Sequence, residues 1–469
     1  SDGREIVLHI TRTRWPFDAN APAVSIAPVK SSAITPMDSL VTSCSFQQPV
    51  AACIIDATTF RRNEIGRQPL DGSALEGTRV LDLTHHIAGP YCTKLLADFG
   101  ADVIKVERPG AGDPARNQGP FVDDDAHPDK GLPFLYLNTS KRSVTLNLKS
   151  PAGQRILEEL VAESDVVVES FRPTFLPSLG LGYEHLRKEN PSLVMVSISS
   201  FGQSGPYRDY EATDIVEYAL GGILYIFGLN EREPLKHALD QAQYKAGTNA
   251  ASGAAIAILH RLLTGQGQLV DVSIQESITS AVRDTTSAFA NYGIVKWRQP
   301  KTTSEMPRGP VETSDGYIMP IAFGGVDWCA TADFLNAPEL KEDRFATPEG
   351  REEHADELQE ILSSTFAGWK KFDLFYEAHK QRRLIYGVVQ DGKEALNNPQ
   401  YESRGYFVDI DHPVAGLHTY PGAPFNMSET PWRASSSAPT LGQHNSEIYG
   451  NRLGYSKAEL ARLAAAGVI

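Results

Sequence analysis

The chain has 469 residues, of which 41% are hydrophobic and 22% charged, so it carries enough apolar material for a globular core. Its formal net charge of −14 excludes general binding to nucleic acid or to an anionic membrane, unless basic residues gather in a local patch. The longest apolar stretch, residues 218–229, is too short to span a bilayer, and no secretory signal is recognised. We therefore expect a soluble, cytoplasmic protein.

The four cysteines are Cys44, Cys53, Cys92 and Cys329. None forms a C-x-x-C pair, and no Cys/His set has the spacing of a zinc site, so no metal is expected. The pattern favours reduced thiols in an intracellular protein.

Composition and periodicity divide the chain into four parts. Residues 1–73 form an N-terminal extension, rich in Ser, Thr, Pro and Ala, which is either an arm packed on the main body or a contact or regulatory segment. Residues 74–299 are expected to form a large α/β domain. Residues 300–410, with charged amphipathic helices, predict a smaller α+β domain, and residues 411–469 are expected to return to the large domain.

Strands and helices alternate through the large domain. Nearly all-apolar strands are expected at residues 79–84, 102–107, 165–169, 193–199 and 269–273, and helices at 90–99, 151–163, 183–190 and 250–263. This alternation predicts a doubly wound, Rossmann-like parallel sheet covered on both faces. The first half of the helix at 250–263 has almost only small residues, which predicts close contact with a neighbouring backbone.

Eight short stretches give a sharper indication of function. They are VLDLT at 80–84 followed by AGP at 88–90, LLADFGADVIKVE at 95–107, NTSKRS at 138–143, LNLK at 146–149, ESFRP at 169–173, LG at 179–180 with GY at 182–183, SSFGQSGP at 199–206 and TGQGQLVDV at 264–272. Together, and in this order, they resemble the family III CoA-transferases, a group that includes formyl-CoA and carnitine CoA-transferases and the α-methylacyl-CoA racemases. The resemblance extends over about residues 75–469 and leaves out the extension.

The resemblance implies a binding site for coenzyme A. A βα turn places backbone N–H groups and a helix N-terminus at the carboxyl end of a strand, where an anion is favoured. The positions that match CoA-binding residues of the family are His85, His86, Ile87, Arg108, Arg142, Leu146, Lys149, Ser170, Phe171 and Arg172. Guanidinium and ammonium groups suit the CoA phosphates. The histidines are equally well explained by packing at a strand end.

The resemblance also implies a nucleophilic aspartate four residues before a glycine, and here that position holds Gln243, before Gly247. An amide cannot form the labile anhydride and thioester intermediates of CoA transfer. Three interpretations remain open. Asp240 acts as the nucleophile instead; or the chain is a nucleophile-free, CoA-binding subunit of a hetero-oligomer; or it catalyses a non-covalent isomerase or lyase reaction on an acyl-CoA.

The racemase branch uses a histidine before an Asp-Ile pair, and Thr213 stands there instead. Asp214 is retained, either at the site or as a helix N-cap. We therefore predict an enzyme that transfers CoA between carboxylic acids, with acyl-CoA and an acid as substrates. The resemblance implies an interlocked dimer, either a homodimer or a heteromer with a paralogous subunit.

Overall fold

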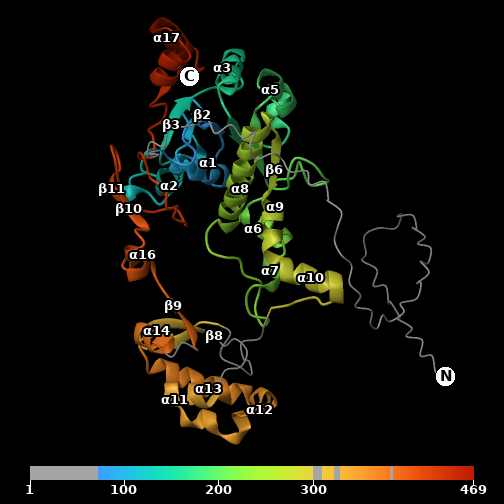
Figure 1. The fold of residues 1–469 in the computed structure, drawn as a ribbon, viewed down its shortest axis with the longest axis vertical. Coiled ribbons are helices and arrows are strands. Elements are labelled where there is room, and N and C mark those ends of the chain that lie inside the picture. The colour runs from blue at the N-terminus through green and yellow to red at the C-terminus, as the bar shows by residue number, and fades with distance from the viewer. Residues whose placement is uncertain (1–71, 299–308, 322–327, 381–383) are drawn as a thin grey trace, which may run out of the picture. The chain divides into compact units, whose positions relative to one another are not determined.

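The computed structural model describes residues 72–298, 309–321, 328–380 and 384–469 (Figure 1). The chain divides into two units, Ser1–Arg67 and Gln68–Ile469. The predicted N-terminal extension, residues 1–73, lies almost entirely outside the described residues.

A six-stranded parallel sheet forms the centre of the large domain. Its strands are β1 (Arg79–Leu83), β2 (Asp102–Glu107), β3 (Lys141–Thr145), β4 (Val166–Glu169), β5 (Val194–Ser199) and β6 (Leu269–Ser273). Their order in the sheet is β3-β2-β1-β4-β5-β6. This is the order of a Rossmann-like doubly wound sheet, so the predicted fold class is confirmed.

The helices of this part of the chain include those that cover both faces of the sheet. They are α1 (Ala88–Asp98), α2 (Leu132–Leu137), α3 (Pro151–Ala162), α4 (Phe175–Ser178), α5 (Tyr183–Glu189), α6 (Asp214–Leu220), α7 (Ile223–Ile226), α8 (Gln241–Thr264), α9 (Ile274–Thr279) and α10 (Arg283–Tyr292). Side chains of successive residues in a strand point to opposite faces of the sheet, so they pack in different hydrophobic cores. Val80 packs with α1 and α8, whereas Leu81 packs with α3 and α5.

The remaining elements form smaller units. An antiparallel sheet contains β7 (Val311–Thr313), β8 (Gly316–Ile321) and β9 (Ile385–Val389). The helices of this part are α11 (Trp328–Leu335), α12 (Pro348–Glu353), α13 (Ala355–Ala367), α14 (Lys371–Lys380), α15 (Gly392–Leu396) and α16 (Pro399–Ser403). Strands β10 (Phe407–His412) and β11 (Gly416–Pro421) pair as an antiparallel hairpin.

The C-terminal residues pack on the edge of the large sheet. The His444 N–H donates to the Ser143 carbonyl of β3 at 2.9 Å, and the Tyr449 hydroxyl donates to the Thr145 carbonyl at 2.9 Å. The helical turn Ser446–Arg452 and helix α17 (Lys457–Ala465) follow, and their apolar side chains join the core beneath α3 and α5. Throughout the described ranges, no helix combines the length and apolar character needed to cross a membrane.

Helix α8 lies against α1 at very short range, as its small residues predict. A Cβ atom at Gly247 would lie 2.6 Å from the Ala88 carbonyl oxygen and 3.1 Å from the Tyr91 ring. Because the nearest of these atoms belongs to the backbone of α1, the contact cannot be relieved by a side-chain rotation. This close approach fixes the start of α8 beside the turn that precedes α1.

Replacing Gly247 by alanine should therefore destabilise the protein, although alanine normally stabilises a helix by about 1 kcal/mol relative to glycine. We expect a net loss of about 1–3 kcal/mol in the free energy of unfolding, because the added methyl overpacks the interface. Urea denaturation measures this change. The control is Asn249→Ala on the exposed side of α8, which should be neutral or stabilising. Equal stability of the two variants would contradict the contact.

Candidate active site

The site lies where the strand order of the large sheet reverses. Strands β1 and β4 are neighbours, but the chain continues from β1 to β2 on one side and from β4 to β5 on the other. The loops after β1 and β4 therefore diverge and leave a crevice at the carboxyl ends of the strands, which is where open α/β sheets bind their ligands.

A first cavity of about 660 Å³ opens at this crevice. The loops after β1, β2, β3 and β4 all contribute to its wall. Of the predicted CoA-binding residues, seven line it: His85, His86, Arg108, Leu146, Lys149, Ser170 and Phe171. The sequence pattern therefore brings together side chains that are up to 86 positions apart.

A second cavity of about 480 Å³ adjoins the first, since both are lined by His85, His86, Ser170 and Phe171. It extends toward the end of β5 and the N-terminal turn of α8. The remaining predicted residues in its wall are Arg172 and Gln243. The two cavities give a continuous path along the carboxyl ends of strands β1 to β5.

The turn between β1 and α1 separates the two cavities and is held by side chains from distant loops. The His85 N–H donates to Ser170 Oγ at 3.0 Å, and the His86 N–H donates to Asp113 Oδ1 at 3.1 Å. His86 has a φ of 64°, a conformation that a residue with a side chain rarely adopts. Ile87 is the N-cap residue of α1 and is not among the residues lining either cavity.

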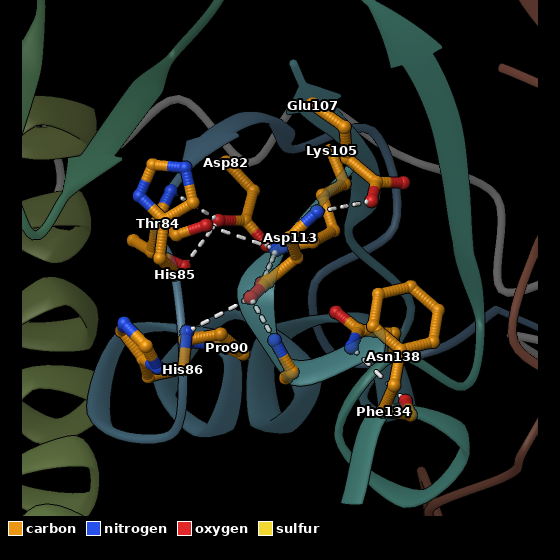
Figure 2. A network of polar contacts seen from close by, with 12 residues as sticks. Asp82, Thr84, His85, His86, Pro90, Lys105, Glu107, Asp113, Phe134 and Asn138 are labelled. Atoms are coloured by element: carbon orange, nitrogen blue, oxygen red, sulfur yellow. Dashed lines mark hydrogen bonds and ion pairs between the residues drawn. The ribbon is translucent and has the colours of Figure 1, made fainter. Parts of the chain in front are cut away.

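Four buried charged groups lie beside this turn, and Figure 2 labels three of them, Asp82, Lys105 and Asp113. Lys105 Nζ is 2.9 Å from Asp113 Oδ2, and Lys141 Nζ is 3.0 Å from Asp82 Oδ2. Lys105 also donates to the carbonyl of Thr84 at 3.0 Å. Burial alone would raise the pKa of Asp82, but the two lysines and hydrogen bonds outweigh it and hold that pKa far below its ordinary value. The cluster is thus two carboxylates neutralised by two ammonium groups.

Of the two histidines in the turn, His85 is uncharged at neutral pH. Burial, followed by the charge of Lys105, lowers the pKa of His85 to about 4. Its imidazole also lies edge-on to the Phe171 ring, with centroids 5.2 Å apart. His85 therefore offers a ligand an aromatic face and a neutral nitrogen rather than a positive charge.

The positive charge of the first cavity comes from Arg108 and Lys149, which are exposed and have no ion-pair partner in the described part of the chain. Arg172, on the wall of the second cavity, pairs with Glu211. Arg142 lies elsewhere: it is the second residue of β3, near the amino ends of the strands, and pairs with Asp102 and Glu447. It is absent from the lining of both cavities, because these lie at the carboxyl ends of the strands.

Comparison with known proteins identifies the family to which this chain belongs. The family described as CoA-transferase family III matches residues 75–445. The chain belongs to CoA-transferase family III. It is 36% identical over 406 residues to the succinyl-CoA–D-citramalate CoA-transferase of Chloroflexus aurantiacus, covering 84% of this chain and 98% of that protein.

Two further relatives agree with this. The succinyl-CoA:(R)-benzylsuccinate CoA-transferase subunit BbsE of Thauera aromatica is 32% identical, over 83% of this chain and 97% of that one. A crystal structure of a CAIB/BAIF family protein from Brucella suis superposes with a TM-score of 0.73 at 28% identity, covering 81% of this chain and 99% of the other. The sequence-based family assignment is confirmed, and the chain is a CoA-transferase that handles CoA thioesters.

The predicted catalytic residues of this CoA-transferase have different surroundings. Gln243 lines the second cavity. Asp214 is buried and engaged through both oxygens, since Oδ1 accepts the Ala242 N–H at 2.9 Å and Oδ2 pairs with Lys236 at 2.7 Å. Asp240 is the exposed N-cap residue of α8, its side chain makes no capping hydrogen bond, and it is not part of either cavity wall.

The sequence analysis did not identify Glu217, a buried acidic residue of the transferase. It belongs to α6, lies in the wall of the second cavity and accepts a hydrogen bond from Gln243. Its position two residues before Ala219, in a mostly apolar helix, carries no signal of its own in a single sequence. Only the packing of α6 against α8 reveals it. Among the described residues, no group of three or more His, Cys, Asp or Glu side chains could hold a metal ion.

Replacing Asp113 by asparagine should destabilise the transferase by about 3–5 kcal/mol, because Lys105 would lose its closest counter-charge in a fully buried position. Asparagine keeps an oxygen for the His86 and Ala115 N–H groups, so the turn keeps these hydrogen bonds while Lys105 loses the carboxylate it faces. Urea denaturation measures the loss. Glu184→Gln, which removes a pair with Arg187 on the surface of α5, is the control. A loss no greater than that of the control would show that the buried pair is unimportant.

Proposed function

We propose that the first cavity binds the nucleotide and phosphates of CoA, and that the second cavity holds the acyl thioester and the acid that accepts CoA. The proposal depends on one observation: eight of the ten residues that match the family's CoA-binding positions line a path across the strand ends at the switch point. The thioester would lie near His85 and Phe171, the residues that both cavities share.

The charged side chains support the placement of the CoA phosphates in the first cavity and of the acyl group in the second. Arg108 and Lys149 give the first cavity two positive side chains that are available for phosphate oxygens. A protein of net charge −14 needs such a local concentration to attract a polyanion. The second cavity has a more mixed wall, with Arg172 and Arg208 beside Asp209 and Glu211.

We further propose that the acyl group is a dicarboxylic one such as succinyl. The two relatives described above are transferases whose names specify succinyl-CoA. In this chain, Arg172 and Arg208 in the second cavity could hold the distal carboxylate, if their acidic partners Glu211 and Asp209 give way.

An oligomer is part of the proposal. The outer side of α8 exposes Ile256, Leu259, Leu262 and Leu263, each more than half accessible. An apolar surface of this kind is typical of a protein interface. We propose that a second copy covers it, in a dimer. A paralogous subunit is the alternative, supported by the BbsE relative, which is named as a subunit. The free thiols of Cys92 and Cys329 agree with the proposed cytoplasmic location.

Changing Arg108 or Lys149 to alanine should weaken CoA binding by roughly 10-fold to 100-fold each, the value of one charge-assisted hydrogen bond. Isothermal titration calorimetry with CoA gives the affinity. Arg155→Gln, an exposed cation on α3, is the control and should bind CoA like the unmodified chain. Unchanged affinity in both cavity variants would place the phosphates elsewhere.

The activity itself is tested by exchange. The purified chain should transfer CoA from succinyl-CoA to isotope-labelled succinate, because donor and acceptor are then chemically identical and only the label reports transfer. Label appearing in the thioester confirms the reaction. Tight CoA binding without exchange, restored by adding a paralogous subunit, would favour the nucleophile-free subunit instead. Loss of CoA from the thioester without label transfer would contradict transfer between acids.

A further inference from the structure

A buried carboxylate stands in the wall of the second cavity without a positive partner. Glu217 is 1% exposed. Gln243 Nε2 donates to its Oε2 at 2.9 Å, and within the described ranges its Oε1 has no hydrogen-bond partner. No lysine, arginine or histidine of the described chain forms an ion pair with it. A buried carboxylate in such surroundings costs free energy, which is typical of groups retained for function.

The surroundings of Glu217 raise the pKa of its carboxyl group. Burial is the main cause, and Asp214 on α6 and Asp240 at the start of α8 add to it. Hydrogen bonding to Ser200 and Gln243 opposes this effect only in part. The result is a pKa of about 7, so a substantial fraction of Glu217 is an anion at neutral pH. A poorly solvated anion of this kind is a stronger nucleophile than one surrounded by water.

The surroundings select Glu217 among the acidic groups near Gln243. Asp214 has both oxygens engaged, by Lys236 and by the Ala242 N–H. Asp240 is exposed and outside the cavity walls. Glu217 Oε2 is oriented by Gln243, Oε1 accepts no well-formed hydrogen bond from a described donor, and the Ser200 hydroxyl is its nearest further polar neighbour. Glu217 therefore has what an attacking carboxylate needs: a fixed position and an unengaged oxygen.

We propose that Glu217 supplies the nucleophilic carboxylate of CoA transfer, while Gln243 orients it. This inference rests on the proposed function, since it names the group that carries out that reaction. It resolves the difficulty raised by an amide at position 243, because the carboxylate has moved from α8 to the facing helix α6, with its oxygen still 2.9 Å from the residue at the original position.

The carboxylate of Glu217 is the one enzyme group that forms covalent intermediates in the proposed reaction, and it is regenerated at the end. An oxygen of Glu217 attacks the thioester carbonyl, the C–S bond breaks, and CoA leaves as a thiolate, which gives a mixed anhydride. The thiolate attacks the glutamyl carbonyl and releases the first acid as its carboxylate, leaving a glutamyl-CoA thioester. The acceptor carboxylate attacks that thioester and expels the thiolate. The thiolate then attacks the acceptor's acyl carbonyl, which forms the new acyl-CoA and regenerates the Glu217 carboxylate.

Trapping tests this directly. The full chain is incubated with succinyl-CoA and hydroxylamine, digested, and its peptides are sequenced by mass spectrometry. A hydroxamate on Glu217 that depends on succinyl-CoA is the expected result. A hydroxamate on Asp240 or any other residue overturns the proposal, and so does exchange activity without any trapped side chain.

Substitution provides the second measurement. Glu217→Gln is isosteric and keeps an oxygen for Gln243, so folding and CoA affinity should be unchanged, whereas exchange should fall by at least roughly 1,000-fold. Glu276→Gln, an exposed glutamate in the first turn of α9, is the matched control and should retain full exchange. Exchange in Glu217→Gln within tenfold of the control overturns the proposal.

The two proposals fail in different ways. If the unmodified chain exchanges label but Glu217→Gln does so equally well, CoA transfer stands and only the role of Glu217 is wrong. If the unmodified chain neither binds CoA nor exchanges label, the proposed function is wrong and the role of Glu217 falls with it.

Discussion

The site depends on a buried ion pair between a strand and a loop. Lys105 of β2 holds Asp113 at 2.9 Å, and the same aspartate accepts the His86 N–H. The pair thereby fixes a turn whose left-handed backbone is otherwise unfavourable. Because both charges are fully buried, neither can be lost without leaving the other uncompensated. The position of the β1–α1 turn, which borders both cavities, follows from this constraint.

A second group of buried charged residues fixes the loop after β2. Arg116 is buried, forms two hydrogen bonds with Glu107 at 2.7 and 2.8 Å, and stacks 3.7 Å from the Phe134 ring. Ser143 of β3 donates to the same glutamate at 2.6 Å. The loop after β2 is thus fixed by its own strand and by the next one. Arg108, at the start of this loop, therefore projects from a rigid support, and such supports preserve the geometry of a site.

Features that depend on local sequence patterns could be predicted, whereas those that depend on tertiary contacts could not. The strands, the doubly wound sheet and the close approach of α8 follow from apolar runs and small residues, which act over short distances. Most of the CoA-binding positions follow strand ends, so topology alone gathers them. Arg142 belongs to the same set of motifs but lies near the start of β3. The order of the motifs does not show whether a residue lies at the amino or the carboxyl end of its strand. Glu217 depends on the contact between α6 and α8, which no local pattern contains.

With Glu217 in the proposed role, its pairing with Gln243 explains how CoA transfer can proceed with an amide at the position where the family resemblance implies a carboxylate. The two side chains come from helices that meet at the cavity wall, so either helix can present a carboxylate to the same space. Keeping two carboxylates there would cost energy through mutual repulsion. An amide facing one carboxylate removes that repulsion and adds a hydrogen bond. A glutamine at position 243 therefore fits a site whose carboxylate belongs to α6.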